Sequence, residues 1–191
     1  NARADAIVTI NTCNHLSLLG YNVTLVTPRY AETKAYNTEQ ICSHFGIKNY
    51  TFEIVYLPFK IRPKDGKKII ITKKFLASLF YCLKMSGKFI KNNIIAISRD
   101  EITTYSFMLF RYLFPRKTPI IFEVHDPKIN RTFTFLYKNS DAILFTTDKT
   151  KELFRQSMQL GDKPCLTVRN GYSPENYVPK EKKSEIRVEL S

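Results

Sequence analysis

Polar side chains follow three apolar runs of the sequence, each at the point where a strand is predicted to end. The runs finish in SRD (98–100), HDP (125–127) and RNG (169–171). In an open parallel sheet, ligands bind at the carboxyl ends of the strands, so the polar residues at these ends are the candidates for contact with a substrate. They are Arg99, Asp100, His125, Asp126, Asn170 and Gly171.

Each of these three pairs also has a purely structural interpretation. The first favours a surface ion pair followed by a helix N-cap. The alternative for the second is a structural role, in which the pair caps the next helix or satisfies loop amides. The third is first of all a turn signal. The order of the three pairs along the chain is therefore more informative than any one of them.

The predicted elements around these residues alternate between helix and strand. Helices are predicted over residues 2–19, 38–46, 72–91, 101–113 and 148–158, the last with Asp148 as its N-cap. Strands are predicted over residues 21–28, 52–58, 93–100, 120–124, 141–146 and 165–171. Because the strands are apolar throughout and separated by helices, the fold class is α/β, a Rossmann-like parallel sheet with helices on both faces.

The domain organisation follows from the same order of elements. Residues 1–171 are predicted to form one Rossmann-like domain, and 172–191, where proline and charge accumulate, to form a linker and the start of a further domain. A doubly wound sheet normally opens with a strand before the first helix. We therefore expect the first strand to lie upstream of residue 1.

Composition narrows the partners without choosing among them. The 191 residues carry 30 Lys and Arg against 17 Asp and Glu, a net charge of +13, which favours nucleic acid, an anionic membrane surface or a phosphate-bearing substrate. The four cysteines are scattered without C-x-x-C or zinc-ligand spacing, so no metal site is predicted. They indicate buried thiols in a reducing, cytoplasmic compartment, with a disulfide framework as the alternative.

A membrane contact is predicted at the surface only, since no run approaches the roughly 20 apolar residues of a membrane-spanning helix. In residues 67–93 an apolar stripe is flanked by many lysines, a pattern suited to anionic lipid. The alternative is a sheet-covering helix with a solvated basic face. The predicted membrane contacts are Lys73, Lys74, Phe75, Phe80 and Lys84.

Several phrases of the sequence resemble one enzyme family. NARADAIVTINTCNHLSLLGYNVTLVTP resembles the first helix and second strand of the retaining glycosyltransferases of family four, which have the GT-B fold. SRD followed by PIIFEVHDP is similar to their T/S-R-D and V-x-E-x-H-D phrases, and NSDAILFTTDKTKELF resembles the following strand and helix. VRNGYSPENYVP resembles the phrase that ends their N-terminal domain. The donor-binding C-terminal domain of that family has no counterpart among these residues.

The resemblance implies the acceptor-binding half of an enzyme that moves a sugar from a nucleotide-sugar donor to a polysaccharide or glycolipid. It implies that His125 approaches the donor sugar as the catalytic candidate, while Asp126 shapes its loop. Arg99 and Asp100 would face the same cleft, and Asn170 with Gly171 would mark the exit toward the hinge. No cofactor is implied. The chain alone is expected to be inactive, because the second domain of the family holds the nucleotide sugar.

Two other functions are compatible with parts of the pattern. Sugar-nucleotide epimerases share the GT-B architecture. The basic charge also suits a nucleic-acid-binding domain, but the sequence has no RNA-recognition, KH, zinc-finger or helix-turn-helix signature. We therefore expect no nucleic-acid partner, and place the enzyme at the inner membrane face.

Overall fold

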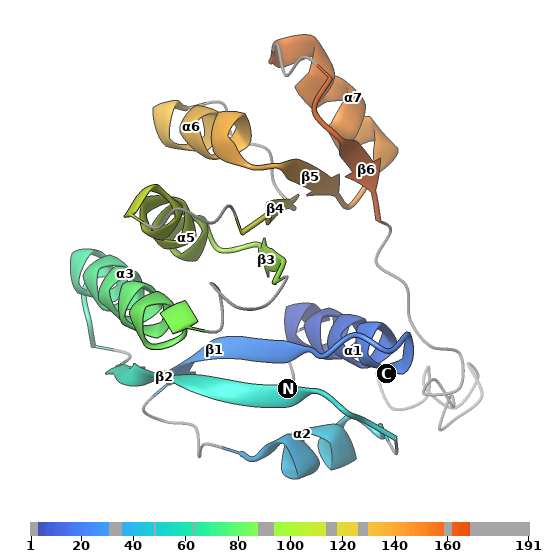
Figure 1. Cartoon of the computed structure of the whole chain (residues 1–191), viewed down its shortest axis with the longest axis vertical. Helices are drawn as coiled ribbons and strands as arrows, with labels where there is room; N and C mark the ends of the chain where they lie inside the picture. The colour runs from blue at the N-terminus through green and yellow to red at the C-terminus, as the bar shows by residue number, and fades with distance from the viewer. Residues whose placement is uncertain are drawn as a thin grey trace, which may run out of the picture. The chain divides into compact units, whose positions relative to one another are not determined.

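The computed structural model describes residues 4–30, 36–47, 49–62, 64–87, 94–113, 118–125, 130–158 and 162–168. Its helices are α1 (Ala4–Leu18), α2 (Thr38–His44), α3 (Lys67–Lys84), α5 (Glu101–Leu113), α6 (Arg131–Asn139) and α7 (Asp148–Ser157). Its strands are β1 (Thr24–Tyr30), β2 (Glu53–Ile61), β3 (Ala96–Ser98), β4 (Ile120–Val124), β5 (Ala142–Phe145) and β6 (Cys165–Thr167). The chain is α/β, with parallel strands flanked by helices, which confirms the predicted fold class (Figure 1).

The described strands form two hydrogen-bonded sheets. One has the order β3-β4-β5-β6 with every pair parallel, and the other pairs β1 with β2. The chain also divides into two compact units. Unit 1 lies within Asn1–Val26 and Ala35–Val55, and unit 2 within Thr27–Lys34 and Tyr56–Arg169. β1 and β2 contribute residues to both units.

In unit 1 a glycine follows each of the two helices, α1 and α2. Gly20 and Gly46 follow α1 and α2 with φ angles of 89° and 70°, a backbone region that glycine enters without steric cost. α2 begins at a capping box, in which the Asn37 side chain accepts from the Gln40 N–H at 2.8 Å. The core of unit 1 consists of Ile10, Cys13, Cys42, Ile47 and Phe52.

Unit 2 has its core on one face of the four-stranded sheet. Alternate residues of β4 and β5, among them Phe122 and Phe145, are fully buried. They pack in a single cluster with side chains of α5, α6 and α7, so these three helices cover the same face. Right-handed crossovers between successive parallel strands place the helices this way. On the opposite face, Ile97 and Leu166 remain about half exposed.

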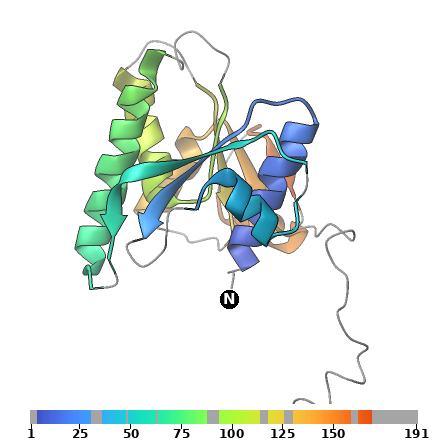
Figure 2. The ribbon, with the colours of Figure 1, turned by 90° about the horizontal axis from the view of Figure 1, so that it is seen from below.

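Helix α3 packs alongside α5 in unit 2 (Figures 1 and 2). Its inner side consists of the small buried residues Ala77, Ser78 and Cys82. The Ser78 hydroxyl lies 3.3 Å from the Thr103 hydroxyl of α5, and small side chains allow such a close approach of two helix backbones. Helix α3 thus packs against α5 through this inner side.

The sequence interpretation differs from the structure at several elements. Helix α6 was not predicted, although Phe133, Leu136 and Tyr137 bury one helical face and Asn130 caps its start. Helix α3 begins at Lys67 instead of residue 72, because the β-branched run Ile69–Ile71 concealed its start. The N-cap of α7 is Thr147, whose hydroxyl accepts from the Thr150 N–H at 3.1 Å, in place of the predicted Asp148.

Strand boundaries differ as well. β1 continues through Pro28 to Tyr30, because a strand of a two-stranded sheet has an edge where proline costs no ladder hydrogen bond. β3 and β6 are three residues long, shorter than predicted. Among the described helices, none is long and apolar enough to span a membrane.

The one-sided core gives a direct test of the fold. Phe145→Ala removes a fully buried ring and is expected to lower the free energy of unfolding by about 3–5 kcal/mol. Leu166→Ala changes an exposed side chain on the adjacent strand and should cost only about 0.5 kcal/mol. Urea unfolding of both variants measures the difference. If both variants lost the same free energy of unfolding, Leu166 would also be buried, and the core would not lie on one face of the sheet.

Candidate functional site

Strands β3 and β4 end side by side and bring together three side chains. Their register pairs Ser98 with Phe122, so Arg99 emerges next to Glu123. Glu123 Oε1 lies 2.6 Å from His125 Nε2 and 3.3 Å from Arg99 Nη2. We call this group the Arg99–Glu123–His125 cluster. It contains two of the predicted site residues, Arg99 and His125. Glu123, which joins them, was not among the predicted site residues.

The local backbone explains why Glu123 and His125 meet. Side chains two residues apart along an extended segment point to the same face, whereas Phe122 and Val124 point into the core. A sequence signal for Glu123 was present in the i, i+2 spacing and in the glutamate of the V-x-E-x-H-D phrase. The exposed fraction of the side chain rises from 18% at Glu123 to 37% at His125. The histidine is therefore the member of the pair that a ligand can reach.

The hydrogen bond to Glu123 defines what the imidazole can do. An ionised carboxylate only accepts hydrogen bonds, so the Nε2 atom of His125 donates to it. In the neutral ring Nδ1 is then an acceptor, and in the protonated ring it is a donor. Arg99 places a positive charge beside the same carboxylate. The cluster can thus hold an oriented imidazole at the carboxyl edge of the sheet.

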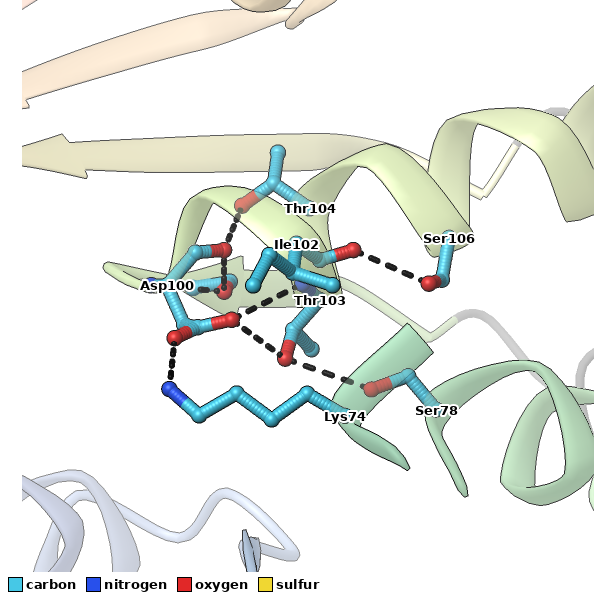
Figure 3. A network of polar contacts seen from close by, with 8 residues as sticks. Lys74, Ser78, Asp100, Ile102, Thr103, Thr104 and Ser106 are labelled. Atoms are coloured by element: carbon cyan, nitrogen blue, oxygen red, sulfur yellow. Dashed lines mark hydrogen bonds and ion pairs between the residues drawn. The ribbon is translucent and has the colours of Figure 1, made fainter. Parts of the chain in front are cut away.

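Asp100 caps the start of α5 with its side chain (Figure 3). Its Oδ1 accepts from both the backbone N–H and the hydroxyl of Thr103, each at 3.0 Å. Its Oδ2 accepts from Lys74 Nζ at 2.6 Å. This is the helix-capping interpretation of the SRD phrase, although the ion pair joins Asp100 to Lys74 while Arg99 pairs with Glu123. The predicted contact of Asp100 with substrate stays a prediction.

The environment of Asp100 changes its titration. Burial on its own would raise the pKa of this carboxyl, but the hydrogen bond from Lys74 and that from the Thr103 N–H outweigh it. The net result is a pKa below the ordinary value of 3.8. Asp100 is therefore ionised near neutral pH and stabilises the folded state in that form.

The remaining predicted residues fall into two groups. Asp126, Asn170 and Gly171 lie outside the described residues. Of the predicted membrane contacts, Lys73 is paired with Asp65 at 2.6 Å and Lys74 with Asp100. Phe75 is half-buried, with its ring 6.3 Å from that of Tyr105 of α5. Phe80 and Lys84 are exposed on the outer side of α3.

The described residues contain no group of side chains suited to bind a metal ion, and their cysteines are not placed as reactive thiols. No three His, Cys, Asp or Glu side chains gather there as metal ligands. All four cysteines are buried and none forms a disulfide, and burial raises the pKa of the Cys82 thiol to about 12. A thiol with that pKa stays protonated at neutral pH and is a poor nucleophile.

No protein-family model matches the chain, and no curated protein sequence matches it either. The chemistry of the described side chains is therefore the basis for a functional proposal.

The Asp100–Lys74 pair predicts a pH-dependent stability. Because the pKa of Asp100 is lowered in the folded state, its contribution is present above pH 3.8 and is lost as the pH falls through the lowered value. Asp100→Asn keeps a good N-cap but removes the ion pair, so it should cost about 0.5–1 kcal/mol near pH 7. It should cost almost nothing near pH 2.

Urea unfolding at the two pH values measures this difference. Asp162→Asn, at an exposed position, is the matched control and should leave stability unchanged at both. A loss for Asp100→Asn that is the same at both pH values would show that the charge of Asp100 is not what stabilises the fold.

Proposed function

We propose that this chain is the acceptor-side half of a GT-B glycosyltransferase, which moves a sugar from a nucleotide-sugar donor to a glycan or glycolipid acceptor. The observation that carries the proposal is the hydrogen-bonded Glu123–His125 pair at the carboxyl end of β4. A parallel sheet presents its ligand-binding groups at that edge. The V-x-E-x-H-D phrase that resembles the family contains both residues of the pair.

In this proposal His125 contacts the sugar that is transferred. The leaving group of such a reaction is a nucleoside diphosphate and the transition state has oxocarbenium character, so catalysis depends on positioning and on electrostatic stabilisation. The Nδ1 atom of His125 is directed away from Glu123 and can bind a sugar hydroxyl. The imidazole acts as a hydrogen-bonding group and does not need to remove a proton.

Glu123 and Arg99 support the histidine. Glu123 lies between the other two side chains, so it fixes the imidazole ring, while the guanidinium of Arg99 balances the negative charge of Glu123. Glu123 is a positioning residue in this scheme, because its side chain is less exposed than that of His125. A carboxylate bound to the second nitrogen of a functional histidine is a common way to fix its tautomer and orientation.

The first test separates catalysis from stability at His125. In the complete enzyme, His125→Ala should lower kcat by about 10²- to 10³-fold through loss of a transition-state hydrogen bond. It should lower the free energy of unfolding by only about 1 kcal/mol, since the side chain is 37% exposed. Glu123→Gln should give a smaller loss of kcat with little change in KM.

The matched control is His15→Ala, which removes an exposed histidine in the last turn of α1 and should leave turnover unchanged. Turnover is measured with nucleotide-sugar donors, and thermal melting is recorded for every variant. A His125→Ala protein that melts much earlier but keeps wild-type kcat would assign His125 a structural role and remove the basis of the proposal.

A second test asks which domain of the enzyme binds the nucleotide sugar. The resemblance assigns the nucleotide sugar mainly to a second Rossmann domain, so the 191-residue chain by itself should bind common nucleotide sugars with a Kd weaker than about 1 mM. Calorimetric titration should show little heat. Binding near about 1 μM would mean that this half of the enzyme carries the donor site.

A further inference from the structure

Helix α3 carries an apolar stripe on the side that faces away from α5. Ile69, Leu76 and Leu83 are seven residues apart and Phe80 follows Leu76 by four, so all four lie along one line of the helix. Their exposed fractions lie between 47% and 53%. We call these four residues the outer stripe of α3.

The packing of α3 keeps the outer stripe exposed. Ala77, Ser78 and Cys82 on another side of the helix are buried, and Ser78 and Cys82 pack against α5. Lys73 and Lys74 add ion pairs to Asp65 and Asp100, so the helix cannot turn about its axis without breaking them. Four large apolar side chains that are exposed along one line of a helix indicate an interaction surface.

Unpaired positive charge lies at both ends of the outer stripe. Helix α3 contains no acidic residue, and Lys67, Lys68 and Lys84 have no ion-pair partner among the described residues. Lys67 and Lys68 occupy the first turn, where the helix dipole disfavours a cation. These two lysines therefore do not serve the stability of the helix, and a negatively charged partner would explain their position.

We propose that the outer stripe of α3 lies on an anionic lipid membrane, with Lys67, Lys68 and Lys84 at the headgroups. A helix that lies in a membrane interface requires apolar side chains flanked by lysines. The apolar side chains enter the boundary of the acyl chains, and the lysines attract anionic lipid. Lys73 and Lys74 contact protein carboxylates and are not part of this surface. The membrane contact does not depend on the proposed transferase activity.

The same helix is connected to the candidate site. Lys74 binds Asp100, the residue that follows Arg99 in the chain. If the transferase proposal holds, contact through α3 would hold the enzyme at the membrane that contains a lipid acceptor. The surface thus points to a lipid-linked acceptor in preference to a freely diffusing one.

The test is co-sedimentation of the chain with lipid vesicles, using phosphatidylglycerol mixed with phosphatidylcholine and phosphatidylcholine alone. The wild-type chain should bind the anionic vesicles at low salt and dissociate as salt rises, because the attraction decays over a Debye length of about 10 Å at 0.1 M. It should bind the neutral vesicles far more weakly.

Two variants of α3, each compared with a control variant elsewhere in the chain, test where the membrane contact lies. Leu76→Ser with Phe80→Ser should weaken binding to anionic vesicles by at least about tenfold, whereas Leu153→Ser, an exposed leucine of α7, should not. Lys67→Gln with Lys68→Gln should weaken binding by about tenfold or more. Lys138→Gln with Lys149→Gln removes the same charge from exposed positions on α6 and α7 and should have a much smaller effect.

Three results would overturn the proposal. The first is equal binding to both kinds of vesicle, or none to either. The second is an equal loss of binding in the two lysine pairs, which would reflect net charge alone. The third is a dimer in sedimentation velocity that Leu76→Ser with Phe80→Ser dissociates, since a second copy of the chain would then cover the stripe. Circular dichroism melting confirms that each variant is folded.

Discussion

The alternation of side chains along β4 is the constraint on which both the core and the candidate site depend. Ile120, Phe122 and Val124 are buried among the helices, and this fixes Glu123 on the other face of the same strand. His125, one residue beyond the strand, shares that face through its hydrogen bond to Glu123. A shift of the register by one residue would exchange the two sets, so the apolar core also determines where the polar cluster lies.

Asp100 joins the elements on the other side of the cluster. Its carboxylate caps α5, its partner Lys74 belongs to α3, and its backbone N–H donates to the hydroxyl of Ser98 in β3. One residue therefore connects two helices through its side chain and a strand end through its backbone. Arg99 is held between this junction and Glu123, which gives the polar edge of the sheet a defined geometry.

The sequence was sufficient for the fold class and the position of His125, because apolar periodicity and strand ends are local properties. It missed α6, whose Phe, Thr and Tyr residues also suit a strand. It did not predict that β1 and β2 pair apart from the other four described strands, because strand pairing is not a local property of the sequence. It could not assign the faces of α3, since Lys74 finds its carboxylate 26 residues away.

The buried cysteines divide evenly between the two units. Cys13 and Cys42 lie in the core of unit 1, while Cys82 and Cys165 are buried in unit 2. A buried thiol reacts with an alkylating reagent only when the structure around it opens. The chain thus carries two natural reporters in each unit, and the order in which they are alkylated would reveal whether the units open together or one before the other.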